Sequence, residues 1–143
     1  MPSRQYATFE VADQLFGVEV SAVQEVLAFS EYTAVPLAPA AVAGLFNLRG
    51  QVIAAVDLRV RLGLPAQTLD GPVMNVILRG EDEPVSLLVD RIGDVVELDD
   101  EIEPLPDTIT GPRRDLVVGT LKLEDRLMLA LDVARATEID SRT

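Results

Sequence analysis

Short apolar runs recur along this chain, and a few turn-forming residues separate each run from the next. Runs of this length with such short breaks are typical of β-strands joined by hairpins and turns. Their spacing favours a barrel or a sandwich over alternating β and α units. A mainly β chain is therefore predicted. The runs that we interpret as strands occupy residues 5–11, 15–20, 73–79, 85–90, 92–98, 116–123 and 127–131.

The composition agrees with a β-rich core. Hydrophobic residues make up 48% of the 143 residues but aromatic residues only 4%, so Val, Leu, Ile and Ala must fill the interior. The β-branched share of these residues favours strands. A chain of this length buries about 70% of the surface that its unfolded form exposes. It can therefore fold without disulfides, and it contains no cysteine.

A short helix is predicted directly after the second strand. Ser21 has the side chain of an N-cap, and Val23, Val26 and Leu27 follow at the i, i+3 and i+4 spacing of an apolar helix face. On such a helix Glu25 lies on the opposite side from the apolar stripe, so it faces solvent or a neighbouring segment. The pattern predicts about two helical turns.

Two more short helices and two irregular segments are predicted. Asp57 and Asp132 each follow an apolar run and are suited to cap a helix, and Gly63 is suited to end the first of these. Prolines favour an extended link at 31–39 and a long surface loop at 99–114.

The two halves of the chain resemble each other weakly. Each contains a hairpin, a proline-bearing link and a return strand led by glycine. The return strands read VAGL at 42–45, leading to Asp57, and VGTL at 118–121, leading to Asp132. This similarity predicts two related small barrels within one compact unit.

Catalysis and cofactor binding have little support in the residue types present. The chain has no histidine and no cysteine, so neither a Ser-His-Asp nor a Cys-His arrangement can be built. The carboxylates at 99–101 lie in a charged turn and lack the spacing of a calcium loop. Gly44 and Gly50 are not followed by the Lys-Ser/Thr of a phosphate-binding loop. We expect no enzymatic activity, no cofactor and no metal.

The charge of the chain disfavours polyanionic partners. Its formal net charge is −12, and residues 81–103 contain ten carboxylates and one arginine. Nucleic acid and anionic lipid bind mainly through Lys and Arg, so both would be repelled. The N-terminus lacks the apolar core of a signal peptide, and no run approaches the roughly 20 apolar residues of a membrane span. A cytoplasmic protein is expected.

Arg49 needs a particular explanation. It lies in the segment GLFNLRG at 44–50, among apolar neighbours, and an apolar run follows that ends in DLR at 57–59. Its guanidinium must reach solvent, pair with a carboxylate or be displayed in a groove. Glu25 and Asp57 are available partners.

The other residues of this segment have ordinary structural interpretations. Gly44 and Gly50 suit backbone angles that other residues avoid, and the Asn47 amide suits capping of nearby backbone. Val23 and Val95 would by default be core valines.

At this point several motifs, in order, resemble the CheW-like adaptor family of bacterial chemotaxis. The resemblance covers residues 6–136, essentially the whole chain. Its motifs are VQEV at 23–26, VPLAP at 35–39, GLFNLRG at 44–50, DLR at 57–59, LVDRIGDV at 88–95, VG at 118–119 and LALD at 129–132.

The resemblance implies a fold and a set of partners. It implies one CheW-like domain over residues 1–143, all-β with short helices, built from two SH3-like five-stranded β-barrels. The first barrel would span 14–68 and the second 69–136, with the N-terminal strand free to join the second. Proteins of this family have no catalytic activity. They couple the cytoplasmic tips of methyl-accepting chemoreceptors to the regulatory domain of the histidine kinase CheA, in arrays at the inner membrane.

The resemblance also implies a coupling surface, carried over residue by residue. Its receptor-binding members would be Val23, Glu25, Gly44, Asn47, Arg49 and Val95, near a groove between the barrels, with Arg49 and Glu25 paired. The residues that bind the kinase are not assigned.

Three alternatives remain open. An adaptor of the same fold could serve another receptor-kinase pathway, such as one controlling surface motility or development. A small β-barrel ligand carrier or carboxylate-based enzyme would require a deep pocket with two facing carboxylates. A nucleic-acid-binding barrel is disfavoured by the negative charge.

Overall fold

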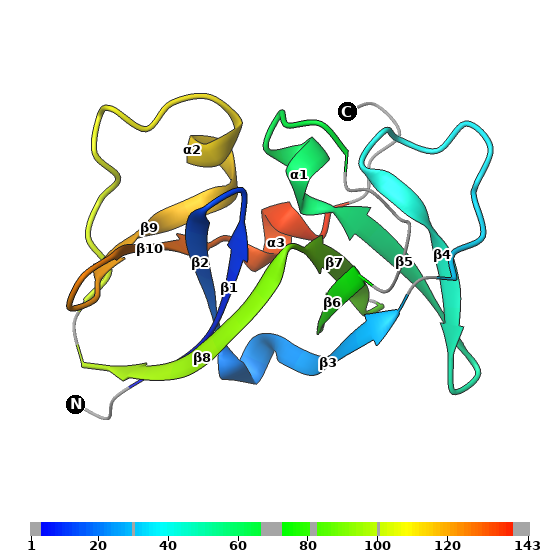
Figure 1. The fold of residues 1–143 in the computed structure, drawn as a ribbon, viewed down its shortest axis with the longest axis horizontal. Coiled ribbons are helices and arrows are strands. Elements are labelled where there is room, and N and C mark those ends of the chain that lie inside the picture. The colour runs from blue at the N-terminus through cyan, green and yellow to red at the C-terminus, as the bar shows by residue number, and fades with distance from the viewer. Residues whose placement is uncertain (1–3, 30, 67–72, 81–82, 100, 139–143) are drawn as a thin grey trace.

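A computed structural model describes residues 4–29, 31–66, 73–80, 83–99 and 101–138. It shows a mainly β molecule with two sheets lying next to each other, the short helices α1 and α2 at the top of the view and α3 between the sheets (Figure 1). The prediction of a mainly β chain is confirmed. The strands are β1 (Arg4–Val11), β2 (Gln14–Glu19), β3 (Val23–Phe29), β4 (Val42–Leu48), β5 (Gln51–Asp57), β6 (Val73–Leu78), β7 (Val85–Val89), β8 (Arg91–Leu98), β9 (Val117–Lys122) and β10 (Leu127–Leu131). The helices are the 3₁₀ turn η1 (Val20–Ala22), α1 (Leu58–Arg61), α2 (Pro112–Leu116) and α3 (Val133–Ala136).

Each sheet has five strands and combines both halves of the chain. The first sheet has the order β3-β6-β7-β5-β4 and the second the order β8-β1-β2-β10-β9. Each contains one parallel pair, β5 with β7 in the first and β10 with β2 in the second, and its other pairs are antiparallel. The two sheets therefore have the same pattern of strand pairing.

The halves exchange their hairpins. Strands β3 to β5 of the first half pair with the β6–β7 hairpin of the second half, and β8 to β10 pair with the β1–β2 hairpin of the first. The weak similarity between the halves thus corresponds to a real structural repeat. The sheets do not follow the predicted ranges 14–68 and 69–136, because each sheet takes strands from both. The N-terminal strand β1 pairs with β8 and β2 in the second sheet.

Two glycines permit the same close approach in each half. The backbone of Thr33 pairs with Leu45, and that of Glu103 pairs with Thr120, as isolated bridges to β4 and β9. A Cβ atom on Gly44 would lie 2.8 Å from the Thr33 carbonyl oxygen, and one on Gly119 would lie 2.4 Å from that of Glu103. The glycine that leads each return strand therefore leaves room for a crossing segment of backbone.

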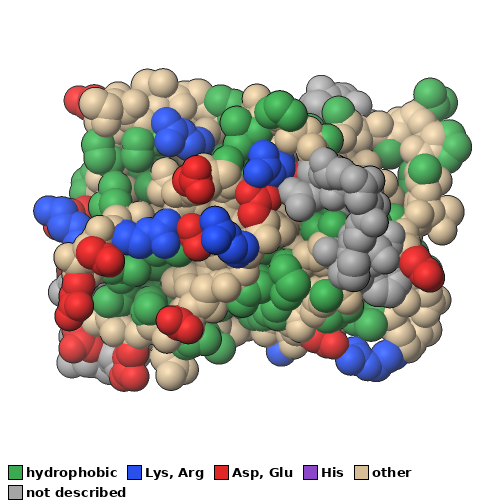
Figure 2. Space-filling view, viewed as in Figure 1, with side chains coloured by type: hydrophobic (Ala, Val, Ile, Leu, Met, Phe, Trp, Pro, Cys, Tyr) green, Lys and Arg blue, Asp and Glu red, His purple; other side chains and the backbone are tan. Residues whose placement is uncertain are grey.

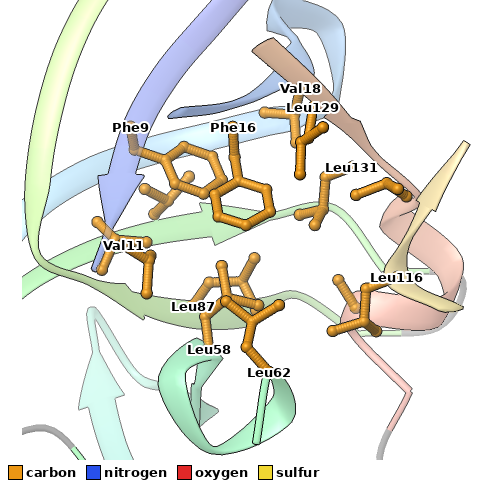
Figure 3. Packing of buried hydrophobic residues seen from close by; sticks show 14 of the residues in the cluster. Phe9, Val11, Phe16, Val18, Leu58, Leu62, Leu87, Leu116, Leu129 and Leu131 are labelled. Atoms are coloured by element: carbon orange, nitrogen blue, oxygen red, sulfur yellow. The ribbon is translucent and has the colours of Figure 1, made fainter. Parts of the chain in front are cut away.

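The largest core lies between the two sheets. Phe9 and Phe16 of the second sheet stack with ring centroids 6.0 Å apart and face Leu87 of the first sheet and Leu58 of α1 (Figure 3). A smaller apolar cluster belongs to each sheet, one around Ile53 and one around Met128. The sheets therefore share one apolar interface, whose burial stabilises their relative placement.

The prediction of a helix after Ser21 is wrong. Only the 3₁₀ turn η1 forms there, and the following residues make strand β3, antiparallel to β6. Val23 and Glu25 are half-buried whereas Gln24 and Val26 are exposed, which is the two-residue period of a strand. The apolar spacing fits either structure over so short a segment, and pairing with β6 decides between them.

The other predictions of local structure largely hold. The side chains of Asp57 and Asp132 accept hydrogen bonds from the backbone amides of Arg59 and Arg135 and so cap α1 and α3. Gly93 lies within β8, which forms where the strand at 92–98 was predicted, and lets this strand pass close to Thr8 of β1.

Candidate functional site

Arg49 lies at the tip of the β4–β5 hairpin. Arg49 and Gly50 form the two-residue turn, and their φ angles of 52° and 87° are both positive. Two-residue hairpins favour such turns because their twist matches that of the strands. The side-chain oxygen of Asn47 accepts a hydrogen bond of 2.9 Å from the Gly50 amide, so the predicted backbone-capping role of this amide is confirmed. The turn holds Arg49 outward from the sheet.

The Arg49 guanidinium binds Glu25 through two hydrogen bonds. Nη1 donates to Oε1 and Nη2 donates to Oε2, and both donor–acceptor distances are 2.7 Å. Such two-pronged contacts are stronger and more directional than single ones. They hold the pKa of Glu25 below its ordinary value of 4.5 and raise the pKa of Arg49. The side chain of Arg49 is nevertheless 68% exposed, and that of Glu25 26% exposed.

This ion pair joins the two edges of the first sheet. Glu25 lies on β3 and Arg49 follows β4, and these strands stand at opposite ends of the sheet order. A contact between them therefore requires the sheet to curl round on itself. The bridge between Thr33 and Leu45 lies across the same opening. Asp57, the other candidate partner, is buried and caps α1.

Val23 and Gly44 lie close to this pair along the chain but serve the interior. Val23 is half-buried and packs against the core between the sheets. Gly44 is buried beneath the segment that contains Thr33. The default interpretation of Val23 as a core valine is thus largely correct. These two residues shape the site from below, whereas Arg49 and Asn47 form its exposed part.

Val95 lies on the other sheet and is not a core residue. It is 59% exposed on β8, where it is paired with Ala7 of β1. Ile92, also on β8, exposes apolar surface as well and was not singled out from the sequence. Both β8 and β3 run along the lower side of the molecule in Figure 1. Val95 and the Arg49–Glu25 pair thus lie on different sheets.

The surface offers little support for catalysis or metal binding. Within the described parts of the chain, no group of three or more His, Cys, Asp or Glu side chains could hold a metal ion. No helix among the described residues is long and apolar enough to cross a membrane. In the face shown by Figure 2, basic and acidic side chains interleave over the second sheet, and apolar side chains are spread across the face. The arrangement suits contacts between proteins more than enclosure of a small molecule.

Comparison with known proteins gives a consistent result over nearly the whole chain. A family model described as a CheW-like domain matches residues 5–140. The chemotaxis protein CheW of Rhizobium meliloti is 34% identical over 131 residues, covering 91% of this chain and 84% of the relative. That of Treponema pallidum is 30% identical over 134 residues, covering 90% and 79%.

A solved structure agrees with these relatives. The crystal structure of the scaffolding protein TtCheW from Thermoanaerobacter tengcongensis matches with a TM-score of 0.85 at 27% sequence identity. The match covers 99% of this chain and 96% of that one. The two five-stranded mixed sheets and their short helices are thus the architecture of a known scaffold. With the family match, the relatives and the fold in agreement, this chain belongs to the CheW-like domain family.

Proposed function

We propose that this chain is a non-catalytic chemotaxis scaffold that couples methyl-accepting chemoreceptors to the histidine kinase CheA. It would act in the cytoplasm, in receptor arrays at the inner membrane. Support comes from the family match, from relatives named chemotaxis protein CheW and from the likeness to a scaffolding protein. The observation that carries the proposal is the Arg49–Glu25 pair, in which a hairpin turn holds Arg49 in a defined geometry while its side chain stays largely exposed.

The proposed receptor-binding surface combines a charged and an apolar part. Arg49, Glu25 and Asn47 would supply directional polar contacts, with Val23 and Gly44 holding them from below. Val95 would supply exposed apolar area on β8, because covering an exposed valine side chain with a partner stabilises the complex. A pair that is already formed loses little side-chain entropy on binding, which favours affinity. The surface that binds the kinase would be separate from this one.

The proposal is tested by Arg49→Glu. This change places two carboxylates together at the edge of β3 and reverses the charge presented to a receptor. We expect the variant to lose binding to a purified receptor cytoplasmic fragment in calorimetry while it keeps binding to the CheA regulatory domain. Arg126→Glu is the matched control, because it breaks a comparable exposed pair with Glu10 in the second sheet. Undiminished receptor binding by Arg49→Glu would remove Arg49 from the coupling surface.

A charge exchange separates the structural role of the pair from a direct contact. The double variant Glu25→Arg with Arg49→Glu restores an ion pair between the two sheet edges but exchanges the positions of the charges. If Arg49 contacts the receptor, the double variant regains the thermal stability of the parent and still fails to bind. Recovery of both properties would mean that the pair only holds the groove in shape.

A further inference from the structure

The chain passes from the first sheet to the second at Asp90, between β7 and β8. The backbone amide of Asp90 donates a hydrogen bond of 3.0 Å to the Glu10 carbonyl oxygen of β1. Its side-chain Oδ2 accepts a hydrogen bond of 2.7 Å from the amide of Ala12, in the turn between β1 and β2. Asp90 is thereby fixed to the hairpin of the second sheet.

The same carboxylate also binds Arg59, which is connected to the first sheet. Arg59 Nε donates to Oδ1 at 2.9 Å, and Nη2 donates to Oδ2 at 2.6 Å. Arg59 lies in α1, which continues directly from β5 of the first sheet. One carboxylate therefore connects α1, the crossover and the β1–β2 turn.

This contact is more enclosed than the pair at the hairpin tip. The side chains of Arg59 and Asp90 are only 28% and 19% exposed. Burial raises the pKa of Asp90, but the hydrogen bonds from Arg59 and Ala12 and the charges of Arg59 and Arg91 outweigh burial, so the pKa is lowered overall. Asp57 orients the arginine, because its Oδ1 accepts a hydrogen bond of 3.0 Å from the Arg59 amide.

The other crossover between the sheets lacks this contact. There the chain passes from β2 to β3 through the 3₁₀ turn η1. In the repeated half, Asp132 caps α3 as Asp57 caps α1, so Ala134 takes the place of Arg59. The ion pair at η1 joins Arg4 Nε to Glu19 Oε1 at 4.0 Å, but both residues belong to the second sheet, so this pair does not connect the sheets. An open apolar pocket of about 190 Å³ lies beside η1. The fold therefore does not itself require an ion pair that connects the sheets at a crossover.

We propose that the Arg59–Asp90 pair is a clamp between the sheets that sets the position of β8 relative to the first sheet. Through β8 it positions Val95 of the second sheet relative to the Arg49–Glu25 pair of the first. Arg59 and Asp90 are positioning residues that act without touching the receptor. The consequence for receptor binding rests on the proposed function, whereas the geometric role of the clamp does not.

The test measures the spacing between the sheets directly. Because the chain has no cysteine, Val52→Cys on β5 and Val95→Cys on β8 give two exposed, unique sites for spin labels. Double electron–electron resonance should give one narrow distance distribution with the clamp intact. We expect Asp90→Asn to broaden this distribution or add a second distance, and Arg59→Lys, which keeps the charge but loses the two-pronged contact, to broaden it less.

Controls make the result specific. Arg126→Gln removes an ion pair within the second sheet and should leave the distribution narrow. A narrow, unshifted distribution in folded Asp90→Asn, or in Arg59→Gln if Asp90→Asn fails to fold, overturns the clamp. A broadened distribution together with weakened binding of the receptor fragment by the unlabelled variants supports both geometry and consequence. If the parent protein does not bind the receptor fragment at all, the proposed function fails while the distance measurement still decides the clamp.

Discussion

Leu37 is an unusual residue for its position. It is fully exposed at 102% and has a φ of 63°, in a turn closed by a hydrogen bond of 3.3 Å from the Ala38 amide to the Val35 carbonyl oxygen. Pro36 suits the first central position of such a turn, but the second favours Gly or Asn. A leucine there combines backbone strain with exposed apolar area.

Replacing Leu37 should therefore stabilise the protein. We expect Leu37→Asn to raise the free energy of unfolding by about 0.5–1 kcal/mol, because asparagine tolerates the left-handed conformation. Urea denaturation measures the change. Leu37→Ala is the control that removes the exposed side chain without relieving the backbone, so a gain equal to that of Leu37→Asn would contradict the strain argument.

Asn75 is a fully buried polar residue in β6. Its Nδ2 donates 2.8 Å to the Val73 carbonyl oxygen, and its Oδ1 accepts from Ser86 Oγ at 2.8 Å and Tyr32 Oη at 2.9 Å. It thereby joins β6, β7 and the link after β3. In the sequence it is a single polar letter within an apolar run, with no sign of which groups it would bind.

Removing this amide should be costly. We expect Asn75→Ala to lower the free energy of unfolding by about 2–4 kcal/mol, because it opens a cavity and deprives a buried hydroxyl of its acceptor. Thermal and urea denaturation provide the measurement. Gln24→Ala, an exposed change on β3, should alter stability by no more than about 0.5 kcal/mol. Similar small effects for both would show that the network contributes little.

At the scale of elements, strand β3 shows where a local pattern fails. Over residues 23–29 the apolar spacing allows a helix, but a helix there would leave β6 paired with β7 alone and the first sheet without its edge strand β3. Pairing with a strand about 50 positions away decides the structure, and such long-range pairing cannot be read from a seven-residue window. Glu25 reaches Arg49 only because this segment is a strand.

The return strand β9 depends on Gly119. An added Cβ atom would lie 2.4 Å from the Glu103 carbonyl oxygen and 2.3 Å from Ile102 Cγ2, so the backbone bridge between Glu103 and Thr120 could not keep its hydrogen bonds of 2.8 Å. We expect Gly119→Ala to destabilise the protein by about 1–3 kcal/mol and to speed amide exchange at Thr120. The neighbouring exposed change Val118→Ala should do neither.

At the scale of the whole molecule, the clamp predicts a dependence on pH. Because folding lowers the pKa of Asp90 below its ordinary value of 3.8, the charged carboxylate stabilises the fold above that value. This contribution is lost as the pH falls below 3.8 and through the lower folded pKa. We expect Asp90→Asn to cost about 1–3 kcal/mol at pH 7, intermediate between exposed and buried ion pairs. Urea denaturation should show this difference shrinking at pH 3; a constant difference would contradict a charged Asp90 as its source.

The exchanged hairpins predict that neither half folds alone. Each sheet needs strands from both halves, so separate chains of residues 1–68 and 69–143 should lack cooperative unfolding by circular dichroism. Mixed together, they should form a one-to-one complex with the spectrum of the parent. Cooperative unfolding of either isolated half would instead support independently folding barrels over 14–68 and 69–136.

By itself, the sequence determined the local features of this protein. Turn residues, capping carboxylates and short β-branched runs act over a few neighbours, so strands β1, β2 and β6 to β10, the start of β4 and the capped helices α1 and α3 could be predicted in place. The ordered motifs also identified the family and the residues Glu25 and Arg49. The tertiary structure decided which half each hairpin joins, the strand at β3, the exposure of Val95 and the Arg59–Asp90 clamp. These depend on contacts between segments far apart in the chain, whose free energies are absent from any local window.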